Sequence, residues 1–117
     1  MDLEAVREIA MALPEVTEEP HFEMTSWRIR KRLFATAAPS GERIHVFVDE
    51  DEVRASVAEN GTAFEELRWG KRLAGLRVNL AEADPETVKA LLAEAWLRKA
   101  PKRLAAEFER CESAGPE

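Results

Sequence analysis

The hydrophobic period of this chain changes several times, and the order of those changes constrains the fold more than any single motif. Residues 2–13 place apolar side chains at helical spacing, and Pro14 ends the pattern because the residue before a proline avoids helical geometry. From Trp27 onward, apolar residues alternate with arginines. Such alternation is typical of a half-buried strand, so the chain changes from helix to strand early in its length.

A first β-hairpin is predicted directly after this change. The basic residues 31–32 lie between the alternating stretch and the apolar residues 33–36, which indicates two strands joined by a tight turn. Residues 39–42 carry a turn signal, and residues 44–48 alternate again as a third strand. Residues 15–23 hold four glutamates and a proline without either period, and we interpret them as a connecting loop.

A second helix and a second hairpin follow. The carboxylates of residues 49–52 suit the positive end of a helix dipole, and Asn60-Gly61 is a stop signal for the helix that they open. Residues 64–69 and 75–80 are predicted to form a hairpin around residues 70–72. The second helix and hairpin thus repeat the earlier order, in which one helix is followed by strands.

The last part of the chain is predicted to be helical. Asp84 is a plausible N-cap before Pro85, and an apolar stripe continues to Trp96. Pro101 breaks this helix, and a short helix that includes Phe108 continues after it.

The patterns predict a single α+β domain in the order α-β-β-β-α-β-β-α, with an antiparallel sheet packed against helices. A chain of 117 residues with 45% hydrophobic residues suits one core. The domain is expected to span residues 1–110, with residues 111–117 as a frayed tail. The single cysteine, Cys111, can form no internal disulfide, and the start of the chain does not read as a signal peptide. No stretch is apolar enough to span a membrane, so we expect a cytoplasmic protein.

Charge is unevenly distributed along the chain. The formal net charge is −6, yet residues 28–43 hold five cations and one acid, and residues 68–80 hold four cations and no acid. A third basic block includes Arg98, Lys99, Lys102, Arg103 and Arg110. Because fields are screened within about 8 Å at physiological salt, such blocks can attract a phosphate backbone locally although the whole molecule is acidic.

The chain resembles the MmcQ/YjbR family of small bacterial proteins. The segments that carry the resemblance are LPEVTE at 13–18, HF at 21–22, WRIRKRLFA at 27–35 and WGKR at 69–72, within a match from about Glu4 to Phe108. Two positions depart from the family pattern: Lys31 stands where many members have glycine, and Leu76 where many have an aromatic residue. The resemblance implies a secretion-chaperone-like α+β fold and a double-wing arrangement that binds DNA.

The first functional hypothesis is therefore a DNA-binding module with two basic hairpins as wings. The candidate residues for this role are Arg28, Arg30, Lys31, Arg32, Arg68, Trp69, Lys71, Arg72 and Arg77. Arginines at a hairpin can donate to phosphate oxygens, and a tryptophan among cations suits base stacking. The hypothesis requires that these side chains converge on one face.

Each basic block also has a structural interpretation. The arginines of the strands could pair with the acids of residues 49–52 and 65–66 on a solvated face, and exposed charges also block edge pairing. Trp69 could cover the core as a lid. The cations at 98–103 lie at a helix C-terminus, where the dipole stabilises them.

Two further functional classes remain open. A protein- or peptide-binding adaptor, or a homodimer, would use the apolar sheet or the regions of Trp69 and Trp96. A small-molecule site could form around His21 and its neighbouring acids Glu18, Glu19 and Glu23. His45 has no metal-ligand partner at a suitable spacing, and no P-loop, GxGxxG, GxSxG or CxxC pattern occurs. We therefore expect no enzyme activity, no metal and no cofactor.

Overall fold

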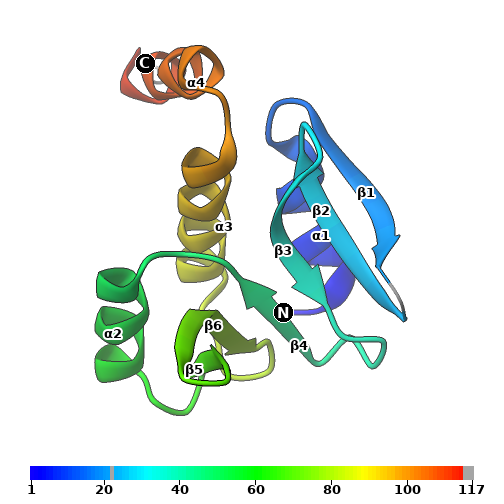
Figure 1. Ribbon diagram of the computed structural model, residues 1–117, viewed down its shortest axis with the longest axis vertical. Helices are drawn as coiled ribbons and strands as arrows, with labels where there is room; N and C mark the ends of the chain where they lie inside the picture. The colour runs from blue at the N-terminus through cyan, green and yellow to red at the C-terminus, as the bar shows by residue number, and fades with distance from the viewer. Residues whose placement is uncertain (22, 115–117) are drawn as a thin grey trace.

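A six-stranded antiparallel sheet organises the molecule, with its first three helices on one face (Figure 1). The computed structural model describes residues 1–21 and 23–114. Within them the elements are α1 (Leu3–Ala12), β1 (Val16–His21), β2 (Met24–Ile29), β3 (Arg32–Ala37), β4 (Arg43–Val46), α2 (Glu50–Glu59), β5 (Phe64–Trp69), β6 (Arg72–Asn79), α3 (Pro85–Lys99) and α4 (Lys102–Ala114). The predicted single α+β domain with an antiparallel sheet is confirmed.

Asp84 acts as the N-cap that the sequence predicts, and two further aspartates play the same part. An aspartate caps each of the first three helices: Asp2 accepts from the Ala5 N–H at 2.9 Å, and Asp49 and Asp84 do the same for α2 and α3. Such side chains satisfy N–H groups that have no partner inside the helix. The helices therefore begin where the sequence predicts.

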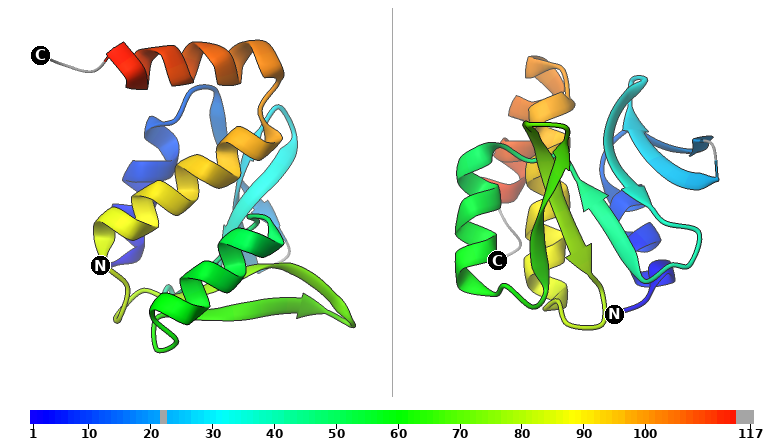
Figure 2. Two further views of the ribbon diagram at one scale, coloured as in Figure 1. Left: turned by 90° about the vertical axis from the view of Figure 1, so that its left-hand side faces the viewer. Right: turned by 60° about the horizontal axis from the view of Figure 1, so that its bottom comes forward.

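The strand order is β1-β2-β3-β4-β6-β5, so β6 lies between β4 and β5 and pairs with both. Helix α3 packs on β3 and β4, α1 on β1 and α3, and α2 on β5 and β6. Figure 2 shows α2 and α3 on the same side of the sheet. This order places the hairpin β5-β6 beside the strand that follows the hairpin β2-β3.

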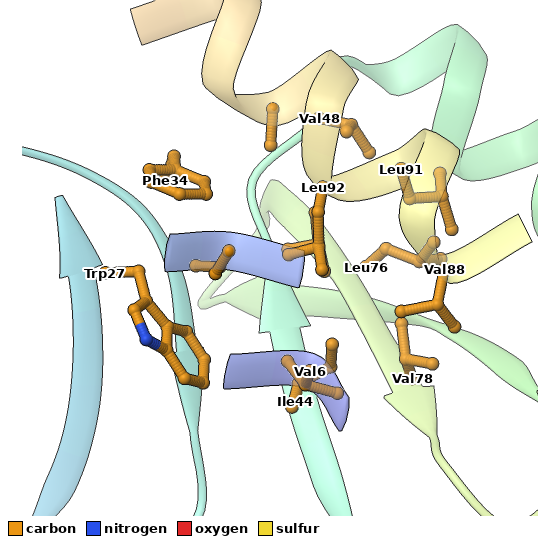
Figure 3. Close-up of a cluster of buried hydrophobic side chains, with 14 of the residues drawn as sticks. Val6, Trp27, Phe34, Ile44, Val48, Leu76, Val78, Val88, Leu91 and Leu92 are labelled. Atoms are coloured by element: carbon orange, nitrogen blue, oxygen red, sulfur yellow. The ribbon is translucent and has the colours of Figure 1, made fainter. Parts of the chain in front are cut away.

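One continuous core lies between the sheet and the helices (Figure 3). Trp27 and Ile44 contribute from the sheet, Val6 from α1 and Leu92 from α3, and all four are fully buried. Trp96 is also fully buried, donates its indole N–H to the Pro14 carbonyl at 3.1 Å, and contacts the ring of α4 residue Phe108. It therefore fixes α4 to the body and presents no surface to a partner.

The prediction of a loop over residues 15–23 is wrong, because residues 16–21 form β1. This edge strand pairs with β2 from Val16 opposite Ile29 to His21 opposite Met24. Pro20 is tolerated because an edge strand leaves one row of N–H groups without partners in the sheet. Apart from Val16, the described side chains of β1 are exposed, so the alternation that would reveal a strand is missing.

Two smaller differences concern element ends. Strand β6 begins at Arg72, earlier than the predicted residue 75, and residues 111–114, assigned above to a frayed tail, continue α4. Residues 115–117, Phe22 and the side chains of His21 and of residues 110–114, Cys111 among them, lie outside the described part of the chain.

Candidate nucleic-acid interface

The two hairpins share a sequence and a register. Both read Arg-x-x-Lys-Arg-Leu, at residues 28–33 and 68–73. Arg28 lies opposite Leu33 and Arg68 opposite Leu73, and each ladder has an irregularity directly before its arginine. The two wings are therefore built alike, and equivalent residues can be compared between them.

The first arginine of each repeat holds its own turn. Arg28 donates from Nη1 to the Lys31 carbonyl at 3.4 Å, and Arg68 donates from Nη1 to the Lys71 carbonyl at 3.3 Å. Arg28 also donates to the Ser26 hydroxyl, and Arg68 forms a 2.8 Å ion pair with Glu66. We conclude that both guanidinium groups stabilise the hairpins.

The turns themselves differ. Arg30 and Lys31 both have positive φ, +48° and +72°, whereas only Gly70 is positive in the second turn, at +66°. Two positive φ values suit the right-handed twist of a hairpin, but side chains other than glycine, asparagine and aspartate rarely adopt them. Lys31 thus occupies a position whose backbone geometry favours glycine.

The last arginine of each repeat faces a cleft between the hairpins, which we call the basic cleft. Its volume is about 470 Å³. The cleft is lined by Arg32, Leu33, Phe47, Trp69, Arg72, Ala74, Arg98 and Lys99. Figure 2 (left) shows both hairpins extending toward one side of the molecule, where α3 also ends. Among the described residues, four cations and no carboxylate line the basic cleft, while Lys31 and Lys71 are exposed at the adjacent turns.

Helix α3 contributes two cations to the basic cleft: Arg98, which is held by a hydrogen bond, and Lys99, whose pKa is lowered. Arg98 donates from Nη1 to the Phe47 carbonyl at 2.7 Å, which ties the helix end to the segment after β4. Partial burial lowers the pKa of Lys99, and the charges of Arg98, Arg32 and Arg72 lower it further. Cations from three elements are thus close enough to repel one another, and a bound anion would relieve this repulsion.

Trp69 forms the aromatic wall of the basic cleft. Its side chain is 55% exposed, and its ring packs on the buried Phe47 with a centroid distance of 5.7 Å at 53°. One face of the indole is supported while a large part remains accessible. Trp69 is therefore not a lid over the main core, which does not include Phe47.

The remaining candidate arginines, Arg30 and Arg77, form ion pairs with glutamates outside the basic cleft. Arg30 forms a 2.9 Å ion pair with Glu15, and this hydrogen bond and the charge of Glu15 raise the Arg30 pKa. Arg77 pairs with Glu65 at 3.2 Å on the sheet face opposite the helices. Such exposed pairs contribute little stability. The structure thus brings together Arg32, Trp69 and Arg72 of the predicted set, while Arg28, Arg30, Arg68 and Arg77 have partners outside the cleft.

Sequence reasoning favoured a structural role for Arg98 and Lys99 at the helix end and left both out of the candidate set. The structure places both in the basic cleft with Phe47. The repeated Arg-x-x-Lys-Arg-Leu motif is the sequence signal that identifies Arg32 and Arg72 as an equivalent pair. No sequence signal indicates that α3 ends between them, because that depends on how the helix crosses the sheet.

The alternative sites receive less support from geometry. Glu18 accepts from the Trp27 indole N–H at 3.0 Å and from Arg7, so this acid has a structural role. Burial lowers the pKa of His45, and the charge of Arg77 lowers it further. Within residues 1–21 and 23–114 no group of three or more His, Cys, Asp or Glu side chains is arranged to hold a metal ion. A groove of about 570 Å³ lies between α1, α3 and α4, away from the basic cleft.

None of the helices in the described part of the chain combines the length and apolar character needed to cross a membrane.

Comparisons with known proteins agree with the fold. The family model described as YjbR matches residues 11–98, and no curated protein matches the chain. Among solved structures, Deinococcus radiodurans protein DR2400, with family-model domain DUF419, superposes with a TM-score of 0.75. The match covers 92% of this chain and 87% of that one at 16% identity, which supports similarity of fold alone. Because the family model spans well over half of the sequence, this chain belongs to the YjbR family.

Proposed function

We propose that this protein is a small DNA-binding module that holds phosphate groups in the basic cleft. The observation that carries the proposal is the convergence of Arg32, Arg72, Arg98 and Lys99 in a cleft whose described lining contains no carboxylate. Phosphate contacts by Lys and Arg supply most of the affinity of such proteins through counterion release. The role is one of binding rather than catalysis.

The acidic remainder of the molecule restricts where DNA could bind. The net charge of −6 disfavours binding over the whole surface, and α2 begins with Glu50, Asp51 and Glu52. Screening confines each field to about 8 Å at physiological salt, so the acids do not cancel the basic cleft. Lys31 and Lys71 would add outer phosphate contacts from the hairpin turns. We propose the cytoplasm as the location, since the single cysteine requires no oxidising compartment.

The test is a fluorescence-anisotropy titration of labelled DNA at roughly 50 and 200 mM salt. On duplex DNA each phosphate that the protein neutralises adds about −0.9 to the slope of log affinity against log salt, so binding should weaken between these conditions and the slope gives the number of phosphates held. The double variant Arg32→Ala/Arg72→Ala should reduce the steepness of this slope by about 0.9 for each phosphate contact that it removes.

A matched control removes two cations outside the basic cleft. Arg54 and Lys89 are exposed on α2 and α3, and neither lines the cleft. Arg54→Ala/Lys89→Ala changes the net charge equally, so a general electrostatic effect would weaken binding to the same extent in both double variants. Equal losses, or no binding at the lower salt, would exclude the basic cleft as the DNA site.

A further inference from the structure

We propose that the basic cleft accepts single-stranded rather than duplex DNA, with one unpaired base stacked on Trp69 and the adjacent phosphate held by Arg32, Arg72 and Lys99. This inference rests on the proposed function and specifies its ligand. It starts from the unusual position of Trp69, a large aromatic side chain that is 55% exposed beside four cations.

Comparison of the two hairpins shows that this exposure is not a requirement of the wing. Trp69 occupies the place in its repeat that Ile29 occupies in the first hairpin, opposite Arg72 and Arg32 respectively. Ile29 is fully buried in the core, whereas Trp69 lies in the basic cleft. The same position in the ladder therefore holds a core residue in one wing and an accessible indole in the other.

The orientation of the indole favours a flat ligand. Phe47 supports the ring from one side, and the Phe47 carbonyl is held by Arg98, so the platform is fixed before any ligand binds. Stacking on an aromatic ring needs an exposed base face, and in a duplex the neighbouring base pairs cover those faces. Only an unpaired base can use both the indole and the cations.

Size and charge agree with one nucleotide in the cleft. A volume of about 470 Å³ lies within the usual range for small-ligand pockets, and the cleft is open enough for a strand to continue from it. The phosphate would lie near Lys99, whose pKa is lowered in the free protein by Arg98, Arg32 and Arg72 as well as by burial. A phosphate there reduces the mutual repulsion of these cations.

The experiment compares three fluorescein-labelled probes at low salt: a thymidine strand of about ten nucleotides, an abasic strand of equal length, and a duplex of that length. The abasic strand keeps every phosphate and lacks every base. We expect the thymidine strand to bind about 5- to 150-fold more tightly than the abasic strand, the range for loss of one stacked base. The duplex should resemble the abasic strand.

Variants separate stacking from charge. Trp69→Ala should abolish the preference for thymidine over abasic strand, and Trp69→Phe should retain most of it because a ring remains. Arg32→Ala/Arg72→Ala should weaken both strands equally. Circular dichroism and thermal unfolding confirm that each variant is folded, and Trp69→Phe provides a conservative test should the alanine variant be unstable.

Intrinsic fluorescence adds a direct readout. Trp27 and Trp96 are fully buried, so quenching by an unlabelled thymidine strand should come from Trp69 and be absent in Trp69→Phe. Titration with thymidine monophosphate determines whether a free nucleotide suffices. Quenching by the monophosphate at the same concentrations as by the strand would assign the cleft to a free nucleotide and overturn the inference.

The outcomes distinguish this inference from the proposed function. Equal affinity for thymidine and abasic strands, with Trp69→Ala unchanged, overturns the stacking inference while loss of binding in Arg32→Ala/Arg72→Ala still supports the DNA site. Tighter binding of the duplex than of the thymidine strand, unchanged in Trp69→Ala, would also overturn the stacking inference and leave the DNA site supported. Failure of all three probes to bind at low salt overturns both.

Discussion

Gly75 is the position at which a single methyl group should disturb both the stability and the cleft. A Cβ on Gly75 would lie 2.6 Å from the Val46 carbonyl oxygen and 3.2 Å from the Phe47 Cα. Ordinary C···O contacts are about 3.3–3.6 Å, so β4 and β6 must separate by about 0.7–1 Å to accept alanine. The obstacle is backbone in a paired sheet and cannot move aside as a side chain would.

The expected cost of Gly75→Ala is about 1–3 kcal/mol of the free energy of unfolding, as for other insertions into packed sites. For a domain of this size that corresponds to a fall in Tm of about 4 °C per kcal/mol. Because Phe47 holds Arg98 and supports Trp69, its displacement should also weaken DNA binding in the folded variant. Urea unfolding followed by circular dichroism measures the first effect, and the anisotropy titration measures the second.

Gly61 offers a matched control. A Cβ there would be 3.6 Å from the Val57 carbonyl oxygen, an ordinary contact, and its backbone φ is not in the left-handed region. Gly61→Ala should therefore be neutral or stabilise the fold by up to about 1 kcal/mol through the unfolded chain. If Gly75→Ala were as stable as Gly61→Ala, the close approach of β6 to the end of β4 would be refuted.

Three further predictions concern the turns, a buried hydroxyl and pH. Lys31→Gly should stabilise the fold by up to about 1 kcal/mol in urea unfolding, since glycine relieves the +72° φ, whereas the equivalent Lys71→Gly should destabilise it. The buried Oγ1 of Thr36 has no hydrogen-bond partner among the described residues, so Thr36→Val should raise the free energy of unfolding by about 1 kcal/mol. Ser26→Ala should lower it, because it removes a 2.8 Å hydrogen bond from the Ser26 hydroxyl to the Glu19 carbonyl. The lowered pKa of His45 means that the unfolded state binds a proton first, so stability should fall as the pH drops below 6.5 toward the folded-state pKa; His45→Gln should reduce this loss in unfolding curves at about pH 7 and 5.5.

The parts of the fold that were predictable depend on local patterns. Asp84 and Pro85 specify the start of α3 within one turn, and the alternation from Trp27 to Thr36 specifies a hairpin whose partners are close in sequence. Strand β1 was missed because its exposed glutamates and Pro20 gain strand geometry only from pairing with β2. An edge strand of this kind has no periodicity of its own to read.

The candidate site likewise has features that local sequence determines and features that depend on tertiary packing. The sequence by itself determined the two Arg-x-x-Lys-Arg-Leu hairpins and the local concentration of cations, because turn geometry and charge depend on neighbouring residues. Only the tertiary structure decided that Arg32, Arg72 and Lys99 share one cleft, while Arg30 and Arg77 are bound by carboxylates elsewhere. The pairing of β6 with β4 and the crossing of α3 over the sheet bring these residues together, and both are set by long-range packing of the core.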